Sequence, residues 1–223
     1  MRTLFAVLLA ARGRVVPVSR IVDEIWYDGR GRRQRDPRNL VHQYVMRLRR
    51  QLGDHNHSVL VTQATGYSLS CEPAQLDARR FEELATRGQE QLTSGDLDHA
   101  FDTLGKALAL WRGTPLEGVP PAPSIVAEAA RLEEARLTAA EMRIDVSHRL
   151  GRHFDTLSET HALRDANPLR EGLWEKEMIA LRACGRRADA LELYQEARRT
   201  LREELGLEPS TRLRVLQQEL LAG

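Results

Sequence analysis

Lysine, cysteine and long hydrophobic runs are scarce in this sequence of 223 residues. Lys106 and Lys176 are its only lysines, so arginine carries nearly all of the positive charge. Cys71 and Cys184 lie far apart and in no CxxC pair, which argues against a zinc site and a disulfide framework and fits a reducing cytoplasm. The apolar stretch TLFAVLLAA is too short to span a membrane and lacks the flanks of a signal peptide. We therefore predict a cytoplasmic protein with no membrane partner.

The patterns that identify an enzyme are also missing. The sequence contains no nucleophile elbow, no credible triad, no evident pair of carboxylates and no phosphate-binding glycine-lysine loop. Trp111 and Trp174 fit helix packing better than a ligand cage. The histidines lack metal-ligand spacing with an acidic partner; those considered are His55, His57, His148, His153 and His161. We therefore predict no catalytic residue, no cofactor and no metal. A small-molecule sensor would need a pocket in the helical part of the chain, to which no motif points.

Charge is distributed unevenly along the chain. The formal net charge is only +1, but residues 1–71 hold 12 arginines and 5 acidic residues, a balance of +7, and the remainder carries −6. A basic first third joined to an acidic remainder indicates a polyanionic partner at one end of the chain only.

Three helices are predicted in the basic first third. RTLFAVLLAARG has helical periodicity and stops at Gly13. VVPVSRIVDEIW predicts a short extended piece and then a helix with Ser19 as its N-cap. The buried face of that helix is predicted to consist of Ile21, Val22, Ile25 and Trp26. The polar stretch YDGRGRRQRDP is predicted to be a charged linker, and the third helix follows it.

The third helix, Arg38 to Leu52, has an unusual polar face. Its apolar stripe is predicted to contain Val41, Val45, Leu48 and Leu52, with Tyr44 beside them. The other side has no acidic residue and consists mostly of His42, Gln43, Met46, Arg47, Arg49 and Arg50. Arginine can neutralise phosphates or bind the O6 and N7 atoms of guanine, and glutamine can pair with adenine. A solvated surface helix fits the same pattern equally well by periodicity alone.

A β-hairpin is predicted after Gly53. SVLVTQATGYSLS contains two short strand segments, Val59–Thr62 and Tyr67–Ser70, around a turn at residues 64–66. Helix, helix, basic helix and hairpin is the order of a winged helix-turn-helix DNA-binding domain, whose third helix lies in the major groove. We predict such a domain for residues 1–73.

The rest of the chain, residues 74–223, is predicted to be helical throughout. Three of its segments resemble one another and start at Gly95, Gly151 and Gly185. The last two are 34 residues apart, which is the period of tetratricopeptide repeats. The longer first interval holds the proline-rich connector RGTPLEGVPPAPS, followed by one long helix. The predicted fold is therefore mostly α: a winged helix-turn-helix followed by an all-α, tetratricopeptide-like domain.

Together, the two parts resemble the Streptomyces antibiotic regulatory proteins, which join a response-regulator-type winged helix to a bacterial transcriptional activation domain. In the first part the resemblance rests on GRVVPVSRIVDEIW, RNLVHQYVMRLRRQLG and TGYSL. In the second part it rests on LDARRFEEL, ALALWRGTPL, ARLEEARLTAAE, NPLREGLWE and GRRADALELYQEARRTLREELGLEPS. These motifs cover nearly the whole chain, and their joint order is highly specific.

The resemblance implies a transcriptional activator of biosynthetic genes. Its copies would lie side by side, as a homodimer, on direct repeats in double-stranded promoter DNA and recruit RNA polymerase, chiefly through the sigma factor. The helical domain would support dimerisation and polymerase contacts, and the protein would associate with the bacterial nucleoid. By position, the groove would be read by His42, Gln43, Met46 and Arg47, and the DNA backbone contacted by Arg38, Asn39, Arg49 and Arg50. Thr65 and Gly66 would mark the tip of the wing.

Two features depart from the family pattern. Family members usually begin with a small antiparallel sheet before the first helix, whereas MRTLFAVLLA already resembles the segment at the end of that region, so we expect the sheet to be missing here. The wing sequence TQATGYSL has no arginine, so we expect weak wing contacts. The expected loss of the sheet keeps a second hypothesis open: a helical-repeat protein-interaction module with impaired or no DNA binding.

Overall fold

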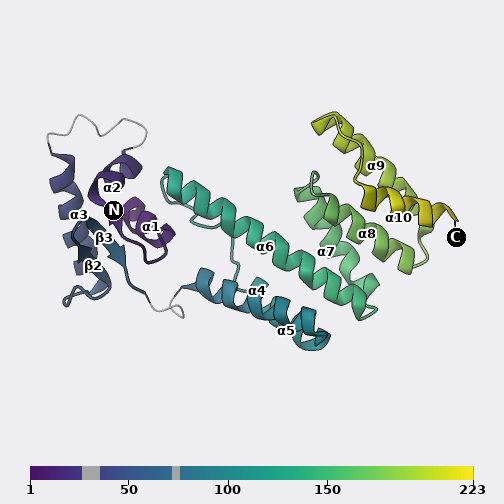
Figure 1. Ribbon diagram of the computed structural model, residues 1–223, viewed down its shortest axis with the longest axis horizontal. Helices are drawn as coiled ribbons and strands as arrows, with labels where there is room; N and C mark the ends of the chain where they lie inside the picture. The colour runs from purple at the N-terminus through teal and green to yellow at the C-terminus, as the bar shows by residue number, and fades with distance from the viewer. Residues whose placement is uncertain (27–35, 72–75, 223) are drawn as a thin grey trace. The chain divides into compact units, whose positions relative to one another are not determined.

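The structure is a computed structural model that describes residues 1–26, 36–71 and 76–222 (Figure 1). It is mostly helical with one small sheet, as predicted. The first elements are α1 (Arg2–Ala10), β1 (Val16–Pro17), α2 (Val18–Ile25), α3 (Pro37–Leu52), β2 (Leu60–Gln63) and β3 (Gly66–Leu69). The later helices are α4 (Asp77–Ser94), α5 (Leu97–Leu108), α6 (Pro123–Arg149), α7 (His153–Ala166), α8 (Glu171–Ala183), α9 (Arg187–Leu205) and α10 (Thr211–Ala222). Most of the predicted charged linker YDGRGRRQRDP, residues 27–35, lies outside the described residues.

Internal contacts divide the chain into two compact units. The first unit comprises Met1–Glu82 and Leu110–Arg136, and the second comprises Glu83–Ala109 and Leu137–Gly223. The helices α4 and α6 each contribute residues to both units. The predicted domain boundary between residues 73 and 74 was based on a change in sequence pattern, whereas this division is based on contacts between residues. The boundary therefore stays a prediction.

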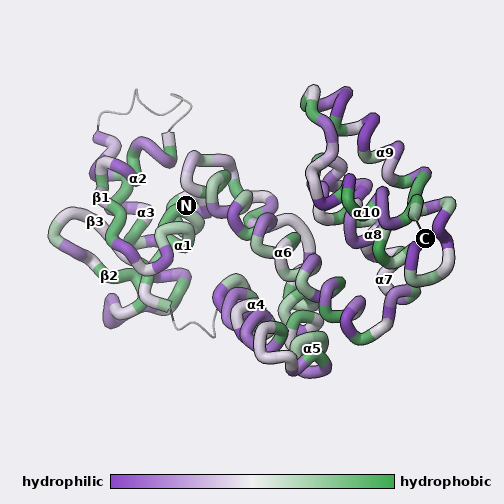
Figure 2. Tube along the Cα trace, turned by 45° about the vertical axis from the view of Figure 1, so that its right-hand side comes forward, coloured by the Kyte–Doolittle hydropathy of each residue, from purple (hydrophilic) through white to green (hydrophobic). Residues whose placement is uncertain are grey.

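The core of the first unit is formed by α1, α2, α3 and the sheet. Hydrophobic residues predominate along α1 (Figure 2). The buried side chains include Leu4, Leu8, Ile21, Val41, Val45, Leu60 and Leu69. The predicted N-cap of α2 is wrong: Pro17 occupies that position, and Ser19 lies inside the helix. The backbone N–H of Val18 donates to the Thr65 carbonyl at 3.1 Å, so the hairpin fixes the start of α2 in place of a side-chain cap.

The sheet joins the predicted hairpin to a strand from earlier in the chain. Its order is β1-β3-β2, with antiparallel neighbours, and Val16 is paired with Tyr67. Gly66 is paired with Pro17 of β1, and a Cβ atom at Gly66 would come within 1.9 Å of the Val16 carbonyl oxygen. Only glycine fits such a close approach of two backbones.

A buried carboxylate connects α2 to the start of α6 within the first unit. Glu24 is buried, and its Oε2 accepts hydrogen bonds from the backbone N–H and the hydroxyl of Ser124, both at 3.0 Å. Ser124 lies in the first turn of α6, where backbone N–H groups lack helical acceptors and favour negative charge. Ala122 and Ile125 from the same segment are buried in the core of the winged helix.

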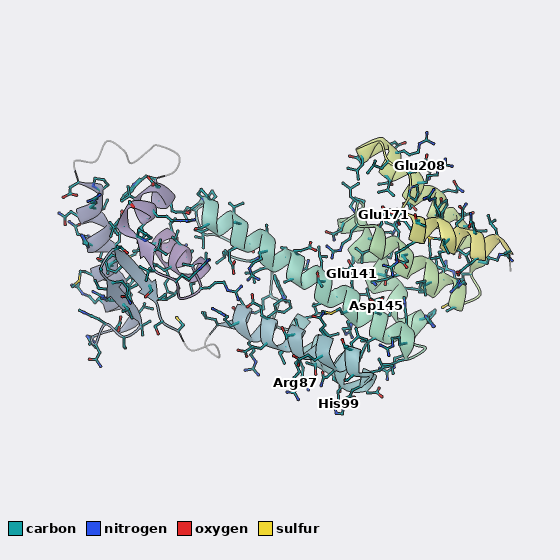
Figure 3. All side chains as sticks on the ribbon, in the orientation of Figure 1. Arg87, His99, Glu141, Asp145, Glu171 and Glu208 are labelled. Atoms are coloured by element: carbon teal, nitrogen blue, oxygen red, sulfur yellow. The ribbon has the colours of Figure 1, made fainter. Side chains whose placement is uncertain are left out.

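The second unit contains a stack of antiparallel helix pairs. α8 packs against α7, α9 and α10 (Figure 1). The three similar segments begin at Gly95, Gly151 and Gly185, and α5, α7 and α9, respectively, each start two residues after these glycines. In Figure 3, Glu171 and Glu208 mark two polar contacts of this stack: Glu171 accepts from the backbone N–H of Ser210, and Glu208 pairs with Arg198. None of the helices within the described residues is both long and apolar enough to cross a bilayer.

A pair of histidines packs at the turn between α6 and α7. The ring of His148 lies 5.0 Å from that of His153, and its Nε2 is 3.2 Å from the hydroxyl oxygen of Thr156. That hydroxyl donates to the His153 carbonyl, so the Thr156 oxygen accepts from His148 Nε2–H. The pKa of His148 is lowered to about 4, chiefly by burial; the neighbouring His153 and Lys176 also lower it, while Asp145 opposes them.

The lowered pKa of His148 predicts that acid destabilises the folded protein. Because the folded protein disfavours protonated His148, its free energy of unfolding should fall as the pH drops from about 6.5, the unfolded pKa, towards about 4. The variant His148→Gln should lose this part of the decrease. Urea unfolding followed by circular dichroism over a pH series measures it. His99→Gln, which changes an exposed histidine of the same unit (Figure 3), should keep the wild-type pH dependence. Equal acid sensitivity in wild type and His148→Gln would contradict the assignment.

Candidate nucleic-acid interface

α3 has well-defined ends that fix its position in the first unit. The Asp36 side chain accepts a hydrogen bond from the backbone N–H of Asn39 at 3.0 Å, and Pro37 occupies the first turn. Gly53 ends the helix in the left-handed conformation, with a φ of 64°. Arg49 and Arg50 lie in the last turn, where cations interact favourably with the helix dipole.

The buried stripe of α3 differs from the prediction at its last member. Val41, Val45 and Leu48 are buried, as expected, but Leu52 is 40% exposed. The fourth buried side chain is Arg49, which is only 8% exposed. The hairpin offers oxygen acceptors at this point, and an arginine can use them where a leucine cannot.

Arg49 joins α3 to the hairpin. Its Nε and Nη2 both donate to the carbonyl oxygen of Leu60, at 3.2 and 2.7 Å, and Nη2 also donates to the hydroxyl of Thr62 at 2.8 Å. The expectation that this guanidinium lies on the exposed face beside Arg50 is therefore wrong. Arg49 sets the angle between the helix and the wing, and the geometry gives it a positioning role.

Asp54 organises the turn that follows α3. Its Oδ1 accepts from the backbone N–H groups of Ser58 and Val59, and its Oδ2 accepts from that of Leu60. Burial alone would raise the pKa of this carboxyl, but the three N–H donors and the nearby Arg49 charge lower it below its usual value. The ionised carboxylate thus holds the start of β2 against the end of α3.

His42 is linked to the sheet through Tyr67. The His42 Nδ1 lies 2.5 Å from the Tyr67 hydroxyl, and the two rings meet edge to face at 6.0 Å. Burial raises the pKa of Tyr67, although the Arg49 charge acts against this, so the phenol is neutral at physiological pH. The His42 ring is exposed but held by this bond, which leaves its other ring nitrogen for an external partner.

The remaining polar residues of α3 form one exposed surface. We call it the α3 face; its members are Arg38, Asn39, His42, Gln43, Met46, Arg47 and Arg50, all exposed. Met46 is 56% exposed, which is high for an apolar side chain. Within the described residues, none of Arg38, Arg47 and Arg50 forms an ion pair. Guanidinium, amide and imidazole groups in this arrangement can bind phosphates and the edges of bases.

The wing tip differs in part from the prediction. Ala64 and Thr65 form a two-residue loop between Gln63 and Gly66, which are paired across the hairpin. Thr65 is exposed, as expected for a tip residue. Gly66 is the first residue of β3 and is buried because β1 packs against it, so it is not exposed at the tip as Thr65 is.

Sequence reasoning missed the residues that hold the α3 face in place. Arg49 was grouped with the exposed arginines, and Asp54 and Tyr67 were not singled out. A signal for Asp54 was present, because an acidic residue directly after a helix-ending glycine often accepts backbone N–H groups in the following turn. The partners of Arg49 and Tyr67 lie on a different element, and helix periodicity carries no information about them.

Two family models match the chain. Residues 76–221 match the bacterial transcriptional activator domain, and residues 1–69 match the C-terminal domain of transcriptional regulatory proteins. Both domains are regulatory and neither is catalytic.

Named relatives cover almost all of this chain. The regulatory protein DnrI of Streptomyces peucetius is 39% identical over 99% of this chain and 83% of its own length. The regulatory protein AfsR of Streptomyces coelicolor is 38% identical over 99% of this chain, which spans only 22% of that longer protein. The transcriptional regulator RedD of the same species is 33% identical, and this chain covers 64% of it.

A solved structure has the same fold. It is the Mycobacterium tuberculosis EmbR in complex with a low affinity phosphopeptide, with a TM-score of 0.92 and 29% sequence identity. The match covers 98% of this chain and 58% of that one. The fold of the first and second parts, a winged helix followed by a helical domain, is therefore confirmed.

The two neighbouring arginines of α3 give a matched test of the geometry. Arg49→Ala should lower the free energy of unfolding by about 1–3 kcal/mol, because the Leu60 carbonyl and the Thr62 hydroxyl lose their buried donor. Arg50→Ala, which removes an exposed guanidinium, should change it by less than about 0.5 kcal/mol. Urea unfolding measures both. Similar stabilities of the two variants would show that Arg49 does not hold the hairpin.

Proposed function

This chain belongs to the Streptomyces antibiotic regulatory protein family, and from that premise we propose that it binds promoter DNA through the α3 face and activates secondary-metabolite genes. Its relatives are named as regulators of transcription.

The observation that carries the proposal is the α3 face itself. A helix whose apolar side is fixed in a core presents three arginines outward, together with amide and imidazole groups and without an acidic residue. Phosphate contacts from Arg38, Asn39 and Arg50 would supply most of the affinity and set the register on the duplex. The groove would be read by His42, Gln43, Met46 and Arg47.

The wing and Arg49 have supporting roles in this proposal. Arg49 contacts the hairpin and keeps the wing at a fixed angle to α3, so it acts on DNA binding through position. The wing contributes Thr65 at its tip, without an arginine, and its contact with the backbone is correspondingly weak.

The family resemblance supports a proposal about the partners. We propose that copies of the chain bind direct repeats side by side, pair as a homodimer on the DNA, and recruit RNA polymerase through its sigma factor. The domain matched by residues 76–221 is described as a transcriptional activator domain, which supports the recruitment step. The proposal places the protein in the bacterial cytoplasm, at the nucleoid.

DNA binding is tested by fluorescence anisotropy with a labelled direct-repeat promoter duplex and a scrambled duplex over a salt series. Wild type should prefer the direct repeat and lose affinity steeply with added salt. Arg47→Ala should weaken binding about tenfold and reduce the slope of log affinity against log salt by about one, because one cationic contact is lost.

The matched control is Arg87→Ala. Arg87 is an exposed arginine of α4 in the second unit (Figure 3), so this change removes the same charge from another surface. It should leave affinity and salt slope unchanged. Equal binding by Arg47→Ala and Arg87→Ala would refute the α3 interface. A wild-type chain with no preference for the direct repeat would favour the alternative, a helical protein-interaction module.

A further inference from the structure

The contact between His42 of α3 and Tyr67 of β3 joins an exposed polar side chain to a buried one. The His42 Nδ1 lies 2.5 Å from the Tyr67 hydroxyl oxygen, so one of these two atoms donates a proton to the other. Tyr67 is held firmly, since it is only 5% exposed and its backbone is paired with β1 and β2. Which of the two atoms donates depends on where the phenol can direct its proton.

The surroundings of the Tyr67 phenol assign the donor. Burial raises the pKa of Tyr67, so the hydroxyl keeps its proton at physiological pH. The nearby Arg49 guanidinium has only donor N–H groups and directs them to Leu60 and Thr62. Among the residues that the structure describes, His42 is the only hydrogen-bond partner of the Tyr67 hydroxyl. A proton on Nδ1 would leave the buried phenol O–H without an acceptor, which costs free energy.

The tautomer of His42 follows from this assignment. A neutral imidazole has one N–H group and one bare nitrogen, so an Nδ1 that accepts from Tyr67 leaves the proton on Nε2. Nδ1 faces the buried phenol and the His42 side chain is exposed, so the Nε2–H group lies on the outer side of the ring. The edge-to-face packing of the two rings, with centroids 6.0 Å apart, opposes rotation of the imidazole. His42 therefore presents a hydrogen-bond donor on the α3 face.

A fixed donor distinguishes between the bases in the major groove. Guanine presents two acceptors there, O6 and N7, whereas cytosine presents its N4 amino group, which is a donor. A fixed N–H group can bond to guanine but is left unsatisfied opposite cytosine. The amide of Gln43 can turn over to offer either its N–H or its C=O group, so it lacks this restriction.

We infer that Tyr67 is a positioning residue for base recognition, which makes His42 a donor that favours guanine over cytosine at one position of the binding site. This rests on the proposed function, because the α3 face must lie in the major groove. Tyr67 is buried and acts only through His42, as Arg49 acts only through the angle of the wing. A residue of the hairpin thus contributes to sequence preference without contacting DNA.

The tautomer is tested in the full chain without DNA. Imidazole ¹⁵N NMR at about pH 8, where an ordinary histidine is neutral, distinguishes a protonated ring nitrogen from a bare one. The His42 signals are identified by their loss in His42→Ala. Wild type should carry the proton on Nε2, and the signal of the bare Nδ1 should move in Tyr67→Phe, which removes its donor. A proton on Nδ1 in wild type, or an unmoved signal in Tyr67→Phe, would overturn the inference whether or not the chain binds DNA.

Base preference is tested by fluorescence anisotropy with duplexes in which each base pair of one repeat is replaced in turn. The position that His42 reads is the one whose preference is lost in His42→Ala. There, wild type should bind guanine about tenfold more tightly than cytosine, the size of one base contact. Tyr67→Phe should reduce this ratio to below about threefold and keep the preferences at the other positions. Tyr194→Phe, the same substitution in the second unit, should bind like wild type.

The results distinguish failure of this inference from failure of the proposed function. A wild-type chain with no preference among the duplexes contradicts both. If wild type prefers particular bases but Tyr67→Phe keeps the full ratio, or weakens binding to all duplexes equally, Tyr67 has only a structural role and the inference alone fails.

The contact made by His42 is tested by the same duplexes. Equal weakening on all of them in His42→Ala would mean that His42 binds a phosphate, and a preference for cytosine at its position would mean that Nε2 is an acceptor. Either result overturns the inference. Should Tyr67→Phe fail to fold, the wild-type tautomer and the wild-type ratio of guanine to cytosine binding decide the matter.

Discussion

The hydrogen bonds between Arg49 and the hairpin are the interaction on which the arrangement of α3 and the wing depends. A recognition helix and a wing can act together only if their mutual angle is fixed, and Arg49 fixes it with bonds to the Leu60 carbonyl and the Thr62 hydroxyl. Asp54 stabilises the same junction by accepting hydrogen bonds from three backbone N–H groups. The two opposite charges are both buried there, so each reduces the cost of burying the other.

Local patterns in the sequence were enough to predict the order of the elements and the outward side of α3. The apolar spacing of Val41, Val45 and Leu48 identifies the buried side, since a helix brings every third or fourth residue to one face. Gly151 and Gly185, from which the repeat period was read, both adopt a positive φ between consecutive helices, because glycine takes this conformation at little cost. The family resemblance supplied the domain types, and the domain matches agree with it.

What the sequence did not reveal depends on contacts between distant residues. Glycine is a common turn residue, so Gly66 was assigned to the turn. It is buried in β3 instead, because the backbone of β1, about fifty residues earlier in the chain, occupies the position that a side chain would need. Arg49 resembles its exposed neighbours in every local respect. Trp111 was predicted to pack, and it does so edge to face against Phe81, a partner on another element that its local sequence does not indicate.

The contact between Glu24 and Ser124 constrains how this architecture can be inherited. The winged helix has core residues of its own, but Ala122 and Ile125 complete that core from a segment far downstream. A recombination event that exchanged winged helices between relatives at the predicted boundary between residues 73 and 74 would separate the Glu24 carboxylate from the helix start that satisfies it. Such a hybrid would need an incoming α2 that matches the first turn of the α6 already present. The two parts of the protein are therefore expected to evolve as a pair, with substitutions in α2 accompanied by substitutions in the first turn of α6.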